Sequence, residues 1–302
     1  MDSLLSTALA AAEAAAQVQL RHFGRIGVDG AREKAHSDFV SAVDLAAQEA
    51  ALEVIRGRHP THRILAEEEL PGDSAESRSR AWPEDGGFLW VVDPLDGTTN
   101  YLHGHPQFAA SVGVGRKTVA PGPGAPNPAG GVFEAGAVVA PRTGERWWAR
   151  RGRGAFKNGL PIFVSSIRSM DAALIGTGFP FKEPELVPRY LQGFQRVLPA
   201  SGGVRRAGSA ALDLCYLAEG TLDGFWEEEY LSPWDVAAGL VILREAGGLA
   251  TRLDGTEIDL ENGSVLGANS PELHRRLGEL VRGVKGVVKR GRGPFSQPPS
   301  SL

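Results

Sequence analysis

Two carboxylates stand where an apolar segment ends, in the stretch WVVDPLDGTTN (90–100). The apolar run finishes at Val92, Asp93 and Asp96 follow at a spacing of three, and small polar residues come next. Alone, the order Pro-Leu-Asp-Gly predicts a turn in which the aspartate bonds local backbone amides. Two acids beside a buried strand are also typical ligands of a hard cation such as Mg²⁺. The stretch therefore has two interpretations, a turn and a metal site.

Three further segments place acids at the boundary of an apolar element. The strand-like RILAEEEL ends in the glutamates 67–69, SPWDVAAGL puts Asp235 at the start of a helix, and SAVDLAAQ puts Asp44 near another helix start. Singly, these acids are interpreted as a solvated face and as helix caps. Together, four segments bring carboxylates to element ends, which is how an oxygen-only cation site is built. The spacing of the first pair suits two Mg²⁺ ions that share a carboxylate, about 3.5–4 Å apart.

Other catalytic chemistries lack their motifs in this sequence. The chain contains no HExxH, no CxxC pair, no GxSxG, no Walker A loop and no GxGxxG after a strand. The GTTN segment that follows the acids offers the amides of Gly97 and Thr98, and amides at the start of a short helix or turn bind phosphate oxygens. Acids and amides together favour phosphate chemistry.

The composition narrows the class of protein. The chain has 302 residues, 42% hydrophobic, with a net charge of -4 and a pI near 6.0, which argues against nucleic acid as the main partner. One cysteine, Cys215, excludes an internal disulfide framework and fits a reducing compartment. We find no signal peptide and no apolar run of about 18 residues, so we expect a soluble cytoplasmic protein with no membrane span. The tail 281–302 carries basic residues and no acid, so we expect it to be disordered; nucleic acid could bind only there.

Strands and helices alternate along the chain, which predicts an α/β or α+β fold. The loop at 120–131, rich in Pro and Gly, is expected at the surface. We predict helices at 4–23, from 41 to Pro60, at 186–197, 209–219 and 235–246, and after Pro271; we predict strands at 63–66, 88–92, 108–114, 133–139, 145–149, 173–176, 224–228 and 265–268.

Several motifs resemble those of the inositol monophosphatase family, within the lithium-sensitive, Mg²⁺-dependent phosphatase superfamily. DPLDGTTN is similar to the family's first signature and WDVAAGLVILREAGG to its second; SDFVSAVD, LAEEE, GAFKNG, GFP and RRAGSAALDLCYLAEGTLDGFW are similar as well. The resemblance covers roughly residues 5–280. It implies an α-β-α-β-α layered fold, a homodimer and two or three Mg²⁺ ions. We expect an N-terminal subdomain at 1–171 with most metal ligands and a C-terminal subdomain at 172–280 with the substrate contacts.

The resemblance also implies roles for individual residues. The metal ligands would be Glu67, Asp93, Asp96, Asp235 and the carbonyl of Leu95. The catalytic residues would be Asp44 and Thr98, which orient and activate the attacking water, together with Glu67. The substrate would contact Asp96, the amides of Gly97 and Thr98, the segment Gly208, Ser209 and Ala210, and one glutamate. Counting forward from the aromatic pair Phe225–Trp226 gives Glu227 as that glutamate, and counting back from Trp234 gives Glu228. The two counts differ because this chain is one residue longer than the family pattern between the aromatic pair and Trp234.

The leading hypothesis is therefore Mg²⁺-dependent hydrolysis of a small phosphate monoester by an activated water, with myo-inositol monophosphate as the first choice and inositol-1-monophosphatase as the enzyme. Alternative substrates are histidinol-phosphate, fructose-1,6-bisphosphate and 3'-phosphoadenosine nucleotides. A hypothesis of another class is a regulatory protein on the same fold that binds RNA or a transcription partner.

Overall fold

The structure is a computed structural model that describes residues 2–35, 38–69, 82–117, 131–181, 183–228, 231–258 and 263–283. The predicted surface loop lies outside the described residues except for Gly131, and so does the basic tail from residue 284. Within the described part, no helix has the length and apolar character needed to cross a bilayer.

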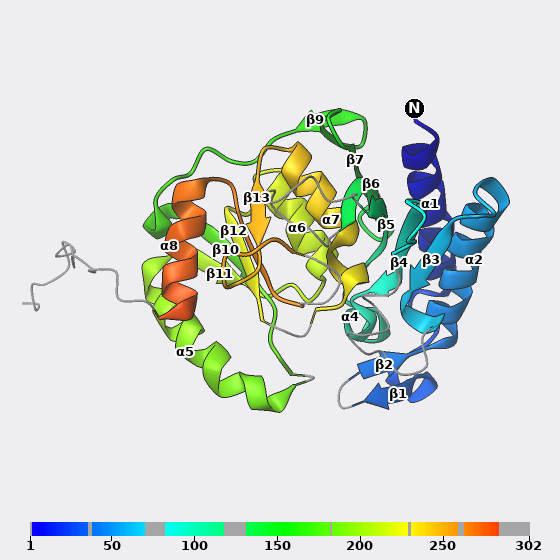
Figure 1. Cartoon of the computed structure of the whole chain (residues 1–302). Helices are drawn as coiled ribbons and strands as arrows, with labels where there is room; N and C mark the ends of the chain where they lie inside the picture. The colour runs from blue at the N-terminus through cyan, green and yellow to red at the C-terminus, as the bar shows by residue number, and fades with distance from the viewer. Residues whose placement is uncertain are drawn as a thin grey trace, which may run out of the picture.

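A seven-stranded sheet forms the larger half of the molecule (Figure 1). Its strands lie in chain order: β3 (Arg63–Ala66), β4 (Phe88–Asp96), β5 (Ala109–Lys117), β6 (Gly131–Ala140), β7 (Glu145–Arg150), β8 (Ala155–Lys157) and β9 (Leu160–Ile162). Only the β3–β4 pair is parallel, and the remaining neighbours are antiparallel. The β8–β9 hairpin turns through Asn158 and Gly159, both at positive φ, as the sequence GAFKNG favours.

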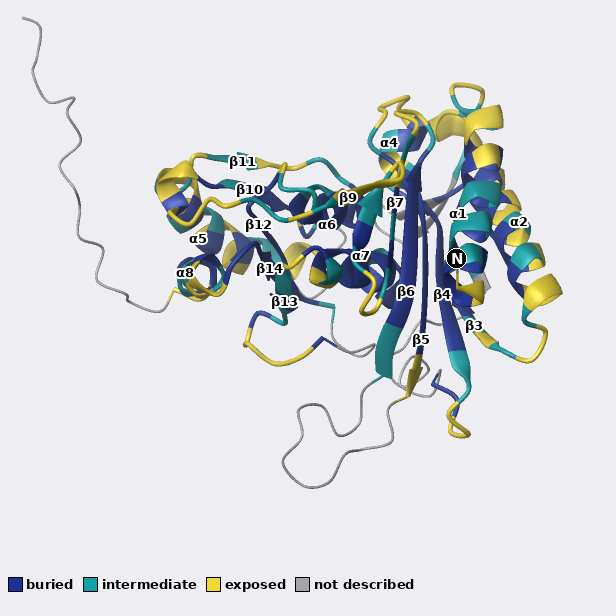
Figure 2. Cartoon of the chain, turned by 90° about the horizontal axis from the view of Figure 1, so that it is seen from above, coloured by how far each residue is buried: buried dark blue, intermediate teal, exposed yellow. Residues whose placement is uncertain are grey.

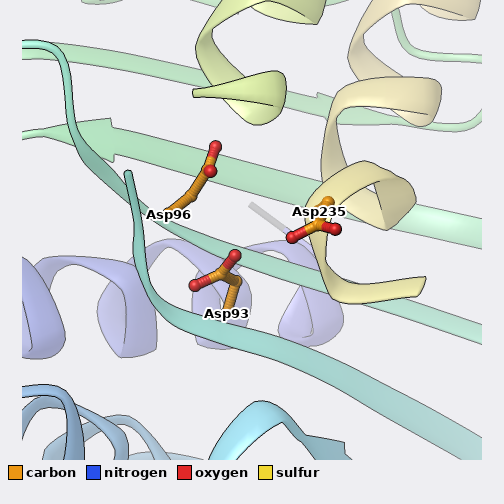
Figure 3. A group of neighbouring side chains, drawn as sticks. All are labelled: Asp93, Asp96 and Asp235. Atoms are coloured by element: carbon orange, nitrogen blue, oxygen red, sulfur yellow. The ribbon is translucent and has the colours of Figure 1, made fainter. Parts of the chain in front are cut away.

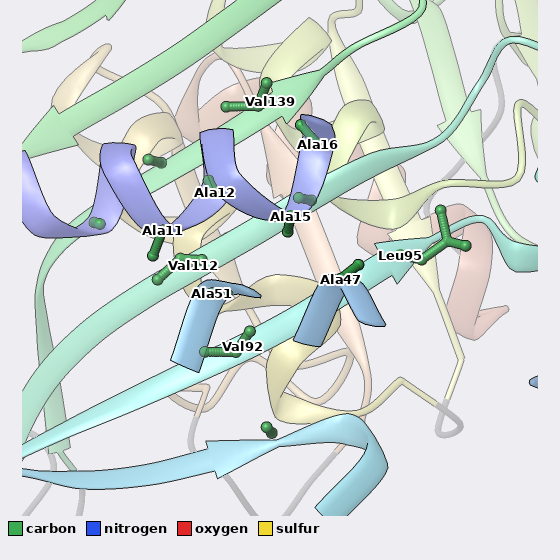
Figure 4. Packing of buried hydrophobic residues seen from close by; sticks show 14 of the residues in the cluster. Ala11, Ala12, Ala15, Ala16, Ala47, Ala51, Val92, Leu95, Val112 and Val139 are labelled. Carbon is green, nitrogen blue, oxygen red and sulfur yellow. The ribbon is translucent and has the colours of Figure 1, made fainter. Parts of the chain in front are cut away.

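Helices α1 (Ser3–His22) and α2 (Ala42–Arg58) cover one face of this sheet. Alanines on their inner faces pack onto valines of the strands, and Ala11, Ala15 and Val112 are fully buried (Figure 4). Alanine combines the highest helix propensity with a small side chain, so α1 can lie close to both α2 and the sheet.

Helices α6 (Ala210–Ala218) and α7 (Pro233–Glu245) lie between the two sheets, with α7 covering the opposite face of the large one. The close approach of α7 depends on glycines in the strands: a Cβ at Gly113 would lie 2.8 Å from Ala237 Cβ, and one at Gly136 would lie 2.7 Å from Ala238 Cα.

A second sheet of five strands follows in the order β11 (Gly203–Arg205), β10 (Leu174–Thr177), β12 (Gly224–Glu227), β14 (Val265–Ala268) and β13 (Leu249–Thr251). Helices α5 (Val187–Val197) and α8 (Pro271–Arg282) cover its outer face. Seen from above, the layers run helix, sheet, helix, sheet, helix (Figure 2). The α-β-α-β-α fold and the mixed α/β class that the sequence predicted are therefore confirmed.

Most predicted elements occur within a few residues of their expected bounds. The structure adds short elements: β1 (Arg32–Ala35), β2 (Asp38–Val40), α4 (Thr98–Leu102), β11 and β13. Helix α8 extends to Arg282, so the predicted tail boundary at 281 is slightly early. The chain passes from the large sheet to the small one between β9 and β10, near the expected boundary at 171, and the division into subdomains stays a prediction.

Candidate active site

The parallel pairing of β3 and β4 brings the first two acids to one edge of the sheet. Ala66 pairs with Val92, the last residues of the two apolar runs. Glu67 is the first residue of the short helix η2 (Glu67–Glu69). Because parallel strands end at the same edge of a sheet, Glu67 and Asp93 lie beside each other. The Gln48 side chain of α2 accepts a hydrogen bond from the Glu68 amide at 2.9 Å, which holds this turn in place.

A bulge in β4 brings Asp96 to the same place. Residues three apart in a regular strand point to opposite faces, which would separate Asp93 from Asp96. In the register with β5, however, Asp93 pairs with Ser111 and Asp96 pairs with Ala109, so β4 carries one extra residue. The bulge bends β4 and turns both carboxylates toward one site.

The third carboxylate comes from the middle helical layer. Asp235 lies in the first turn of α7, where its Oδ2 accepts from the Ser232 amide at 2.6 Å and completes a capping box. One oxygen from each of Asp93, Asp96 and Asp235 lies within 4.8 Å of the others, and the three side chains converge from β4 and α7 (Figure 3). Asp235 therefore takes part in capping α7 as the N3 residue of the box, while Ser232 rather than Asp235 is the N-cap, and the same side chain belongs to the acidic cluster.

Asp96 also joins the sheet to helix α6. Its Oδ2 accepts from the Ser209 hydroxyl at 2.6 Å and from the Ala211 amide at 2.8 Å. Ser209 in turn caps α6 by accepting from the Leu212 amide. The Gly208–Ala210 segment that the resemblance assigned to the substrate is therefore held against the acidic cluster.

The turn after Asp96 requires glycine. Gly97 has φ near +90°, and a Cβ there would lie 2.8 Å from the Gln107 carbonyl oxygen. Asn100 holds the same turn, because its amide donates to the carbonyls of Gln107 at 2.7 Å and Ala207 at 2.9 Å. These two hydrogen bonds fix helix α4 relative to the segment before β5 and to the loop before α6.

Thr98 connects the site to Asp44. The Thr98 hydroxyl lies 3.0 Å from Asp44 Oδ1 and 3.0 Å from the Leu95 carbonyl oxygen. Asp44 is fully buried, and its Oδ2 accepts from both the amide and the hydroxyl of Ser41. Burial raises the pKa of Asp44, while the hydrogen bonds from Ser41 and Thr98 oppose this rise.

A cavity of about 140 Å³ opens over these groups. Its described wall includes the expected residues Glu67, Asp93, Leu95, Asp96, Gly97, Thr98, Gly208, Ser209, Ala210, Glu227 and Asp235. Asp44 is not among the described wall residues and reaches the site through Thr98.

The two candidate glutamates lie in different surroundings. Glu227 is the last residue of β12 and lines the cavity. Glu228 is not among the described wall residues; it is buried and pairs with Arg189 at 3.3 Å. The structure thus brings Glu227, rather than Glu228, to the other wall residues.

Sequence reasoning missed several wall residues, among them Asn100, Phe181, Arg206 and Asp213. Arg206 stacks over the rings of Phe179 and Phe181, at 5.3 and 5.1 Å from their centroids. Asp213 follows an apolar helix start in SAALDL, where a first-turn acid is unremarkable. Its burial beside other acids is a tertiary property without a local pattern.

The electrostatics of the cluster favour a cation. Burial raises the pKa of Asp93 well above its ordinary value, and the nearby charges of Glu67, Asp96 and Asp235 raise it further. Side-chain carboxylates and a backbone carbonyl, without sulfur or imidazole, form a donor set that fits Mg²⁺. The described residues therefore fit the expected metal.

Comparison with known proteins agrees with this geometry. The sequence profile of the inositol monophosphatase family matches residues 1–285. The chain is 39% identical to Nus factor SuhB of Pseudomonas aeruginosa over 272 residues, which cover 89% of this chain and 93% of the relative. It is 36% identical to inositol-1-monophosphatase of Rhizobium meliloti over 281 residues, which cover 93% and 97%.

Among solved structures, extragenic suppressor protein suhB of Bartonella henselae is similar, with a TM-score of 0.78 and 30% identity over 94% of this chain and 100% of that one. The chain belongs to the inositol monophosphatase family.

Proposed function

We propose that this protein hydrolyses a small phosphate monoester with the help of Mg²⁺, and that myo-inositol monophosphate is its substrate. The observation that carries the proposal is the convergence of Asp93 and Asp96 of β4 with Asp235 of α7 in one cavity. A phosphate dianion would be repelled by such a cluster unless cations neutralised it. The name of the Rhizobium meliloti relative supports the choice of substrate.

We assign Glu67, Asp93, Asp96, Asp235 and the Leu95 carbonyl as the groups that hold two or three Mg²⁺ ions. The bound ions would neutralise the phosphate, acidify the attacking water and stabilise the departing alkoxide. The chain itself contributes the arrangement: hydrogen bonds to Leu95, Ser209 and Ser232 fix one oxygen of each aspartate. Little reorganisation is then needed when substrate arrives.

Thr98 and Asp44 orient and deprotonate the water in this proposal. The Thr98 hydroxyl has one proton and two acceptors at 3.0 Å, so it donates to Asp44 while its lone pair accepts from a water. Asp44 is buried and its pKa is raised, which makes it a better proton acceptor than an exposed aspartate. The proton therefore moves from water toward Asp44 through the hydroxyl.

The phosphate and the alcohol occupy different parts of the cavity. The amides of Gly97 and Thr98 would hold phosphate oxygens at the tight turn after β4. Gly208, Ser209, Ala210 and Glu227 would contact the alcohol. Because Glu227 lines the cavity, we assign it, and not Glu228, as the glutamate that bonds a substrate hydroxyl.

The test is phosphate release from a panel of monoesters, with and without Mg²⁺. The panel includes inositol 1-phosphate, histidinol-phosphate, fructose-1,6-bisphosphate and a 3'-phosphoadenosine nucleotide. We expect Mg²⁺-dependent release, fastest from inositol 1-phosphate. No release from any substrate with Mg²⁺ present would refute the enzymatic proposal, and a faster rival would replace the substrate.

A second candidate function is a role in transcription, favoured by the name Nus factor SuhB of the Pseudomonas aeruginosa relative. We propose to compare the full chain with a truncation after Gly283 for binding to RNA and to RNA polymerase. Loss of binding with an unchanged phosphatase rate would assign the role to the basic tail. Absence of binding by the full chain would refute it.

Three further expectations belong to the same proposal. We propose a cytoplasmic homodimer that lithium inhibits. Light scattering after size-exclusion chromatography measures the oligomeric state, and a lithium titration of phosphate release measures inhibition. A monomeric mass would refute the homodimer without affecting the proposed reaction.

A further inference from the structure

Asp213 is a buried carboxyl group without a structural task. It lies in the first turn of α6, is 2% exposed and lines the active-site cavity. Its Oδ1 has no hydrogen-bond partner among the described residues. Such a group is costly to bury, by about 1–3 kcal/mol, unless a partner arrives from outside the protein.

Capping of α6 does not explain this residue. The Ser209 hydroxyl accepts from the Leu212 amide, and Asp96 accepts from the Ala211 amide, so other side chains serve the helix start. The backbone amide of Asp213 donates to the Ser209 carbonyl oxygen, and this hydrogen bond does not involve the carboxyl group. A favourable interaction with the helix dipole also exists for an exposed acid and does not require burial.

The described surroundings of the Asp213 carboxyl group are partly apolar. Its carboxyl carbon lies beside Gly176, where the side chains of Leu222 and Phe225 also meet. Burial raises the pKa of Asp213 well above its ordinary value, the charges of Glu227 and Asp96 raise it further, and Arg206 opposes them. Glu227 and Arg206 both line the same cavity.

We propose that Asp213 binds a hydroxyl group of the substrate's alcohol half, next to the hydroxyl held by Glu227, and so selects polyol phosphates. The inference rests on the proposed phosphatase function and deepens it. A hydroxyl both donates and accepts, so it bonds a carboxyl group in either protonation state. The two carboxyl groups together recognise two hydroxyls of one ring.

The test compares two substrates that differ only in the hydroxyls: inositol 1-phosphate and cyclohexyl phosphate. We expect Asp213→Leu to lower kcat/KM for inositol 1-phosphate about tenfold to a hundredfold and to leave cyclohexyl phosphate within about twofold. Asp213→Asn keeps the shape and part of the hydrogen bonding, so its loss should be smaller. Neither variant should lower Tm, because no internal hydrogen bond is removed.

Each other outcome overturns the proposal. Equal losses on both substrates, or a fall in Tm with parallel losses, would assign Asp213 a role in the scaffold. Unchanged rates on both would show that it contacts no substrate. Failure of the phosphatase proposal is distinct, because the wild-type protein would then release no phosphate from either ester.

Discussion

Replacement of Asp93 by asparagine tests whether the acidic cluster is built for cations at the expense of stability. Asp93 is 1% exposed, and its Oδ1 accepts from the Leu95 amide at 2.9 Å. An asparagine Oδ1 can accept the same hydrogen bond. The variant therefore removes a charge and leaves the packing and the turn in place.

The magnitude follows from the geometry. Two unit charges 4.8 Å apart repel by roughly 3.5 kcal/mol at an effective dielectric constant of about 20. Asp96 and Asp235 together would give roughly 7 kcal/mol, but protonation of Asp93 limits the penalty. Protonating a carboxyl group whose unfolded-state pKa is about 3.9 costs about 5 kcal/mol at pH 7.5, so the repulsion can destabilise the folded protein by no more than that. We expect Asp93→Asn to raise the free energy of unfolding of the metal-free protein by about 3–5 kcal/mol.

Differential scanning fluorimetry in EDTA and in Mg²⁺ measures this effect. At roughly 2 °C per kcal/mol, the variant should unfold about 6–10 °C above wild type in EDTA. Mg²⁺ at a hundred times its Kd should stabilise the wild type by about 2.7 kcal/mol and the variant far less. Phosphate release by the variant should fall at least about a hundredfold.

The matched control is Asp171→Asn, which removes an exposed aspartate in the 3₁₀ helix Met170–Ala172. It should leave Tm unchanged in both buffers. A variant at Asp93 that is less stable than wild type in EDTA would show that repulsion does not dominate the site. An equal response of the variant and wild type to Mg²⁺ would refute the assignment of Asp93 as a ligand.

Three further predictions concern the same site. The folded-state pKa of Asp93 is raised, so the metal-free protein loses stability as the pH rises from about 4, the unfolded-state pKa, through the folded-state pKa. The gain in Tm from Mg²⁺ should therefore grow from pH 5 to pH 8, because protons compete with the ion for the carboxylate. A gain that does not change with pH would contradict this. Gly97→Ala should lower the free energy of unfolding by about 2–3 kcal/mol in urea, given the positive φ and the contact with the Gln107 carbonyl. Thr98→Val should lower kcat by about 10²–10³ with little change in KM or Tm, since it removes only the hydroxyl that reaches Asp44; a changed KM with normal kcat would count against the proton path.

The sequence predicted the positions of the strand-ending acids because their pattern is local. An apolar run followed by acids marks Glu67 and Asp93, and the register of β3 with β4 then brings them together. The bulge that turns Asp96 to the same side was not predictable, because it is a property of the pairing with β5. Short strands such as β11 and β13 were missed for a similar reason, since three residues form too short a pattern.

The choice between Glu227 and Glu228 shows where counting along the chain fails. The extra residue before Trp234 makes both counts reasonable. In the structure, Glu227 pairs with Val265 as the last residue of β12, so the sheet fixes its position. The position of Glu227 in the sheet supports its assignment as the substrate contact, which stays a proposal.

The structural and the functional interpretations of these acids are not alternatives, because a carboxylate has two oxygens. Asp93 bonds the Leu95 amide, Asp96 the Ala211 amide and Asp235 the Ser232 amide, each through one named oxygen. These bonds fix a turn and two helix starts, and all three residues line the cavity. The amides that hold these carboxylates therefore also orient them toward one another, as the proposed cation site requires. This explains why four segments that look ordinary one at a time can form one site.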